Sequence, residues 1–214
     1  MQNELLTGIQ KQNDGNIIKA RGGKEGSQIV QDLHGKYYEH ASRGNVFVAS
    51  TLAAGIVVPF IAATMTSKFT LYNPPGSGVN IELIDLNVLQ VPGSALITGL
   101  GVAFQGPVST TGGAPGTLTV STGQHVSTLV GTGPTPPCIH YSSAILTNVA
   151  IANLSPVIWL FNNVATTVIT QQYCNYQFDG KVIMPPDTLM CLVNSITGTQ
   201  SAAAVSVTYA AYPA

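Results

Sequence analysis

Charge is scarce in this sequence, and most of it lies near the N-terminus. Charged residues make up 8% of the chain, whereas about one quarter is usual for a soluble domain. Six of the eight Lys and Arg and five of the nine Asp and Glu precede Gly44. The rest of the chain lacks the charges that normally solvate a surface. Its exposed faces must therefore consist of Thr, Ser, Asn, Gln and Gly, or they must contact other subunits.

Residues that form exposed helix faces are also scarce after residue 43. That part of the chain holds one Glu and two Lys, while Val, Ile, Thr and Tyr are plentiful. The composition therefore predicts an all-β body. The net charge is −1, and the basic residues near the N-terminus are balanced by acidic ones. We accordingly expect no nucleic-acid partner.

The cysteine content excludes a disulfide framework. The chain has three cysteines, Cys138, Cys174 and Cys191, which are too few and too apolar in context for such a framework. Residues Met1–Ile9 are polar and acidic, unlike the basic and then apolar start of a secretory signal. Assembly in a reducing cytosol is the simpler expectation.

One uncharged stretch, Val46–Met65, is about as long as the roughly 20 residues of a membrane span. Gly55 and Pro59 interrupt it, and residues 56–58 are all β-branched. Two short buried strands are therefore favoured over a transmembrane helix, and we expect no membrane partner.

The charge distribution divides the chain into an N-terminal arm or tether, residues 1–43, and a body, residues 44–214. Residues 1–27 are polar and contain several glycines, which predicts an extended arm. Within the body, residues 106–137 are dominated by Gly, Thr, Ser and Pro. We expect this segment to project as a loop or thin hairpin.

The second half of the arm has a helical pattern. Between Gln28 and Ser42, the side chains of Ile29, Leu33 and Tyr37 recur at helical spacing, and a glycine follows that could end a helix. The sequence leaves two interpretations open. The helix could be a tether packed against the body, or part of an arm that reaches a neighbouring subunit.

The body reads as a series of short strands separated by turns, which favours a jelly-roll-like β-sandwich. The expected strands are 46–50, 56–60, 68–72, 79–88, 95–105, 139–141, 144–151, 157–161, 164–170, 176–178, 181–184, 189–193 and 203–212.

The stretch Tyr173–Val193 contains the clearest local signals. Asp179-Gly180 predicts a two-residue hairpin turn with positive φ at both positions. Pro185-Pro186 ends the returning strand, because proline cannot donate to a ladder. The run Leu189–Val193 has no polar residue, so it should be a central strand with both faces covered.

Two further strands show irregular patterns. The apolar phase of residues 79–88 shifts by one at Leu83-Ile84, which predicts a β-bulge there. In residues 95–105, the small side chains of Gly99, Gly101 and Ala103 share one face. A face of that kind suits close approach of another backbone, at a sheet or subunit contact.

No catalytic motif is present. The sequence has neither a Gly-x-Ser-x-Gly elbow nor a phosphate-binding Gly-rich loop. Cys138 and His140 share a strand face and could begin a metal or nucleophile site, but ordinary packing is favoured. Glu82 and Asp85 would face the same side across the bulge and could bind a cation or do acid–base work, although solvation is favoured. We predict no catalytic residue, metal or cofactor.

A resemblance to structural proteins of tailed bacteriophages covers about residues 34–212. It is carried by His34–Glu39 with Arg43–Phe47, by Leu71–Pro74 with Gly76–Asn80, and by Phe178–Gly180 with Pro185-Pro186. The resemblance implies a head decoration, or cement, protein. Such proteins are often trimeric β-sandwiches that sit between capsomers, with arms that reach over neighbours.

The leading hypothesis is thus a non-enzymatic virion protein on the capsid surface, assembled in the host cytoplasm, with a homotrimer and the major capsid protein as partners. The expected contact residues are Ile29, Leu33, Tyr37, Tyr38, Arg43, Gly99, Gly101 and Ala103. One alternative is a tail or fibre protein that binds host glycan through residues 106–137. Another is a hydrolase that uses Glu82 and Asp85.

Overall fold

The computed structural model describes residues 35–52, 54–60, 64–91, 100–108, 118–121, 124–147, 173–194 and 202–214. Residues Met1–Glu39 and His40–Ala214 form two separate compact units. In the described residues, one helix, α1 (Tyr38–Ser42), precedes thirteen strands. The strands are β1 (Val46–Ser50), β2 (Ile56–Val57), β3 (Thr64–Ser67), β4 (Thr70–Asn73), β5 (Val79–Gln90), β6 (Leu100–Gln105), β7 (Leu118–Val120), β8 (His125–Ser127), β9 (Ile139–Thr147), β10 (Tyr173–Gln177), β11 (Ile183–Met184), β12 (Thr188–Asn194) and β13 (Ala202–Pro213).

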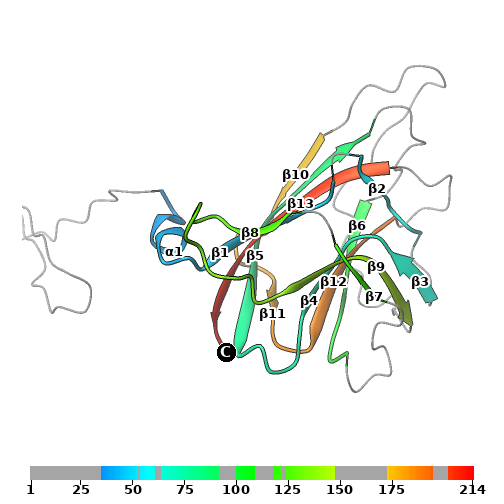
Figure 1. Cartoon of the computed structure of the whole chain (residues 1–214). Helices are drawn as coiled ribbons and strands as arrows, with labels where there is room; N and C mark the ends of the chain where they lie inside the picture. Colours follow the sequence, from blue (N-terminus) through cyan, green and yellow to red (C-terminus); the bar gives the residue numbers. More distant parts are fainter. Residues whose placement is uncertain are drawn as a thin grey trace, which may run out of the picture. The chain divides into compact units, whose positions relative to one another are not determined.

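The strands form two antiparallel sheets (Figure 1). The first sheet has the order β10-β5-β13-β1-β8, with β11 beside β5 and β2 beside β13. The second has the order β3-β9-β4-β12-β6, with β7 beside β9. The chain passes repeatedly from one sheet to the other, as between β4 and β5 and between β11 and β12. This connectivity confirms the predicted all-β, jelly-roll-like sandwich.

The main core lies between the sheets, where alternate residues of each strand point inward. Phe47, Leu86 and Val207 contribute from the first sheet, and Leu71 and Leu192 from the second. These five side chains are at most 3% exposed. The residues between these core positions point to the outer face of each sheet.

Strand β12 is central in the second sheet, and both of its faces are covered. Met190 and Leu192 point into the main core, whereas Leu189, Cys191 and Val193 belong to a second apolar cluster. This confirms the prediction made from its uninterrupted apolar run. The second cluster lies on the outer side of the sheet, so the chain itself buries much of that side.

The predicted β-bulge in β5 is also confirmed. Thr208 of β13 pairs with Asp85, but the next residue, Tyr209, pairs with Leu83, which leaves Ile84 as the extra residue. The backbone oxygen of Ile84 accepts hydrogen bonds from the amides of Phe178 and Asp179, at 2.8 and 3.2 Å. The turn after β10 therefore satisfies the carbonyl that the bulge removes from the ladder.

The turn at Asp179-Gly180 has the predicted backbone conformation, but the expected hairpin is wrong. Strands β10 and β11 both pair antiparallel with β5, so they run in the same direction and do not pair with each other. Asp179 and Gly180 have φ values of 49° and 76°, and the Lys181 amide donates to the Phe178 carbonyl at 2.9 Å. Both central residues are in the left-handed region, as a type I′ turn requires.

Helix α1 ends at the predicted glycine. Gly44 has a φ of 76°, its amide donates to Ala41, and the Asn45 amide donates to His40. This pair of bonds is a Schellman motif, which satisfies the last helical carbonyls. A Cβ on Gly44 would lie 2.6 Å from the Cδ of Pro134, so close packing also requires glycine here. Of the helix expected within 28–42, residues 28–34 lie outside the described residues.

The segment 106–137, which we expect to project as a loop or thin hairpin, contains two short strands, and its described residues 128–137 form no strand. Residues 118–120 form β7, which pairs with β9, and residues 125–127 form β8, which pairs with β1. These strands are three residues long and are held by backbone pairing rather than by an apolar side-chain pattern. A composition of Gly, Thr and Ser does not reveal such pairing.

Some of the expected strands fall on residues that the structure does not describe. Residues 92–99 and 148–172, which include the expected strands at 157–161 and 164–170, lie outside the described residues. The stretch considered as a membrane span contains β1, β2 and β3. In the described part of the chain, no helix is both long and apolar enough to cross a bilayer.

Candidate functional site

The outer face of the first sheet presents a broad, partly exposed surface formed by the described strands. The inward residues of these strands belong to the main core, so the alternate residues point outward. Most of those outward residues are half-buried or exposed, whereas Val46 and Ala210 are buried. We call this surface the open face, and it consists of Val48, Ser50, Asp85, Asn87, Leu89, Val126, Tyr173, Asn175, Gln177, Ala204, Ser206 and Thr208.

The strand register arranges the open face in rows. Asn87 lies between Asn175 and Ser206, and Ser206 is followed by Ser50 of β1. The next row places Asp85 between Gln177 and Thr208. Asp85 carries a carboxylate in these rows, and Glu82, which lies between the core residues Ile81 and Leu83 on β5, carries a second one on the same outer side. The face is therefore largely polar and carries little charge, as the scarcity of charge predicts.

Hydrogen bonds between side chains order the part of the open face that β5 and β10 form. The Oδ1 atom of Asn87 accepts from the hydroxyl of Tyr173 and from Nδ2 of Asn175, the latter at 2.6 Å. Gln177 Nε2 donates to Asn175 Oδ1 at 2.8 Å. Asn87 Nδ2 donates to Asp85 Oδ1 at 3.0 Å. These amides hold one another in place without ion pairs.

Apolar side chains flank this polar ladder. Leu89 is 39% exposed and Tyr173 is 58% exposed at the β5–β10 side, and Val126 on β8 is 49% exposed. Scarcity of charge and exposed aromatic side chains are features that protein interfaces share.

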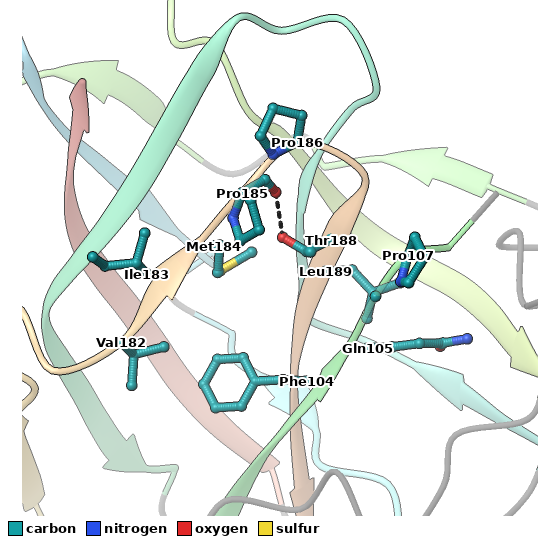
Figure 2. Close-up of a pocket in the computed structure, with 11 residues that line it drawn as sticks. Phe104, Gln105, Pro107, Val182, Ile183, Met184, Pro185, Pro186, Thr188 and Leu189 are labelled. Atoms are coloured by element: carbon teal, nitrogen blue, oxygen red, sulfur yellow. Dashed lines mark hydrogen bonds between the residues drawn. The ribbon is translucent and has the colours of Figure 1, made fainter. Parts of the chain in front are cut away.

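A separate cavity of about 450 Å³ lies between β11, at an edge of the first sheet, and the β6–β12 pair of the second (Figure 2). It is lined by Phe104, Gln105, Gly106, Pro107, Val182, Ile183, Met184, Pro185, Pro186, Thr188 and Leu189. The dashed line in Figure 2 marks the bond from Thr188 Oγ1 to the Pro185 carbonyl, at 2.6 Å. The lining contains no titratable side chain, and its one hydroxyl, that of Thr188, donates to the Pro185 carbonyl.

Glu82 and Asp85 lie on either side of the bulge, as expected, and both are half-buried. Glu82 pairs with Ile183 of β11, and Asp85 pairs with Gln177 of β10. In the part of the chain that the structure describes, no group of three or more His, Cys, Asp and Glu could hold a metal ion. The hydrolase hypothesis stays a prediction, tested by turnover that disappears in Glu82→Gln.

Cys138 and His140 point into the core and are 4% and 2% exposed. Burial raises the pKa of the Cys138 thiol to about 12. The thiol is thus protonated at neutral pH and is a poor nucleophile. The ring of Phe69 lies 4.6 Å from the ring of His140. Packing is therefore the better interpretation of this pair, but His125, for which the sequence offers no partner, joins it from the opposite sheet.

The contact residues expected from the sequence are placed as follows. Tyr37 is half-buried and Tyr38 is 50% exposed in the N-terminal unit, and Arg43 is exposed after α1. Ile29, Leu33 and Gly99 lie outside the described residues.

Gly101 and Ala103 lie in β6, and both are buried within the chain. Ala103 is 0% exposed and belongs to the second apolar cluster. At Ala103, the neighbours that the small side chain allows to come close are therefore residues of the same chain. Neither residue offers an exposed side chain to a partner.

Sequence reasoning did not find the open face, although its signal was present. Polar residues alternate with core residues in β10 and again through Asp85 and Asn87. Only the strand register shows that these residues are neighbours.

Taken together, the fold and the open face define an antiparallel β-sandwich with one broad, nearly uncharged surface. Comparison with protein-family models, with curated proteins and with solved structures gave no match. A function for the chain therefore rests on its own residues and on the resemblance of its sequence motifs.

Proposed function

We propose that this protein is a non-enzymatic virion component that decorates and stabilises a bacteriophage head as a homotrimer bound to the major capsid protein. The observation that carries the proposal is the open face, a largely polar surface on which Asp85 is the carboxylate, with Glu82 on the same side of β5. Burying an ion costs several kcal/mol of desolvation unless it is well paired. Amides and hydroxyls can instead exchange their hydrogen bonds with water for bonds with a partner at little net cost.

The size of the open face bears on how it could be used. Neighbouring strands are about 4.8 Å apart and successive residues on one face about 6.8 Å apart, so the residues of the open face together cover roughly 400 Å² in projection. A stable interface buries about 800 Å² on each partner. The open face would supply about half of that area, and the N-terminal arm, residues 1–43, would supply contacts on an adjacent subunit.

A charge placed on the open face tests the proposal. Ser206→Lys introduces an ammonium group in the central strand β13, where docking would have to desolvate it. Val130→Lys is the matched control, because Val130 is 91% exposed and lies outside the face. Each variant is added to heads that lack the protein, and copies per head are measured from band intensities relative to the major capsid protein.

We expect wild-type protein and Val130→Lys to reach the same high occupancy and Ser206→Lys to lose at least tenfold in affinity. Equal occupancy by all three proteins would reject docking through this face. A wild-type protein that remains a monomer and never co-sediments with heads would reject the decoration role itself.

A second candidate function is host-glycan binding by a tail or fibre protein. The observation that favours it is the ladder of Asn and Gln amides beside the exposed Tyr173 ring, because sugars bind through hydrogen bonds and contacts with aromatic rings. Copy number separates the two functions, since a decoration protein is abundant and an adhesin is rare. Tyr173→Ala should abolish cell-surface binding only if the second function is correct.

A further inference from the structure

Four polar side chains meet inside the sandwich, at the end where β8 lies. His125 comes from β8 and Tyr209 from β13 of the first sheet, whereas Cys138 immediately precedes β9 of the second sheet and His140 lies at its start. His125 Nε2 lies 2.7 Å from the Tyr209 hydroxyl oxygen. The ring centroids of His125 and His140 are 6.2 Å apart. The two imidazoles thus face each other across the core.

His140 has no polar support. It is 2% exposed, and neither of its ring nitrogens has a hydrogen-bond partner. A neutral imidazole tolerates such a place better than an imidazolium, which would lose its hydration without compensation.

The groups that face the two imidazoles carry no negative charge. The segment before β9 contributes the Cys138 thiol, and β13 contributes the Tyr209 phenol. Burial raises the pKa of both groups. From β1, Phe47 stacks on Tyr209 at 5.4 Å. On the β4 side, the ring of Phe69 lies against His140. No described carboxylate forms an ion pair or hydrogen bond with either imidazole.

We propose that this His125–His140 cluster is an acid-sensitive latch, which holds the two sheets together at the β8 end while both imidazoles are neutral and releases them when the imidazoles are protonated. Two positive charges 6.2 Å apart would repel each other and would both lack a counter-ion. Strand β8 has three residues and pairs with β1. It is therefore a short element whose release breaks few backbone bonds.

The direction of the pH dependence follows from the two histidines. Burial lowers the pKa of His125 to about 4, and burial together with the charge of His125 lowers the pKa of His140 to about 4. Because the unfolded chain takes up protons more readily, with a pKa near 6.5, stability is complete above about pH 6.5 and falls as the pH approaches 4. For one such imidazole, the unfolding equilibrium constant rises roughly 50-fold between pH 7 and 4.5.

The scarcity of carboxylates makes this effect measurable. After residue 43 the chain has four acidic residues, Glu82, Asp85, Asp179 and Asp187. Most proteins have many more groups that titrate in the same range.

The first test is urea unfolding of the full chain between pH 7 and 4.5. His140→Phe removes one ionisable group and forfeits no hydrogen bond to the protein, and His40→Gln, in α1, is the control. We expect the unfolding equilibrium constants of wild type and His40→Gln to rise by the same factor between pH 7 and 4.5. For His140→Phe, that factor should be roughly 50-fold smaller. The same pH dependence in all three proteins would overturn the proposal.

The second test needs no variant. The wild-type protein is treated at pH 7 and at pH 4.5 with a pyridyl disulfide reagent, which modifies thiols in acid as well as at neutral pH. Cys174 and Cys191, at 1% and 0% exposure, serve as internal controls. We expect Cys138 alone to react at pH 4.5. In a separate sample that is held at pH 4.5 and returned to pH 7 before the reagent is added, we expect Cys138 to be protected. Protection of Cys138 at both pH values, or simultaneous reaction of all three thiols, would refute a local latch.

Discussion

Asn73 should be among the most sensitive positions in the body, because one side chain fastens two of the crossings between the sheets. It lies at the end of β4 and is 0% exposed. Its Nδ2 donates to the carbonyl of Val79, where β5 begins, at 2.9 Å, and to the carbonyl of Met184, at the end of β11, at 3.0 Å. Asn73→Ala removes both bonds at once.

The magnitude follows from what is left behind. Each lost bond costs about 1 kcal/mol net, and a buried carbonyl without a partner costs about 1–3 kcal/mol. With partial relaxation at both carbonyls, we expect Asn73→Ala to lower the free energy of unfolding by about 2–5 kcal/mol. That is a large share of the roughly 5–15 kcal/mol of a typical domain.

Urea unfolding followed by far-UV circular dichroism measures this loss. Ser77→Ala is the matched control, since Ser77 lies in the same crossing but its hydroxyl makes only 3.4 Å contacts with Val79. It should change stability by less than about 0.5 kcal/mol. An Asn73→Ala protein within about 0.5 kcal/mol of wild type would show that the two carbonyls do not depend on this amide.

Three further predictions use other parts of the chain. Gly44→Ala should lower the melting temperature more than Gly76→Ala, because both glycines have positive φ but only a Cβ at Gly44 would meet Pro134. Equal losses would show that contact with Pro134 adds nothing to the cost of positive φ. Deleting residues 1–33 should weaken attachment to heads without changing the unfolding of the body, and unchanged occupancy would reject the clamp. All three thiols should resist iodoacetamide in the native protein at pH 7, because they are buried, and rapid labelling would contradict that burial.

Local patterns were sufficient for several features of the fold. The bulge at Ile84 follows from the two-residue period alone, because a strand cannot shift its apolar phase without an extra residue. The covered strand β12 follows from the absence of any polar residue between Leu189 and Val193. The turn at Asp179-Gly180 follows from the few residues that accept positive φ.

Features that depend on pairing between distant segments could not be predicted. His125 and Tyr209 are 84 residues apart in the chain, and only the sheet order brings them together. The strands at 118–120 and 125–127 take their place from backbone bonds to β9 and β1, which no side-chain pattern reports. The open face likewise depends on the register of β10, β5 and β13, so its residues are separated in sequence.

The second apolar cluster makes the outer sides of the two sheets unlike each other. Leu189, Cys191 and Val193 show that the outer side of the second sheet is largely sealed by the chain itself, whereas the first sheet leaves its outer side accessible. Under the proposed decoration role, this asymmetry would limit the copies on a head to a single layer, because the side turned away from the head would already be covered by its own chain.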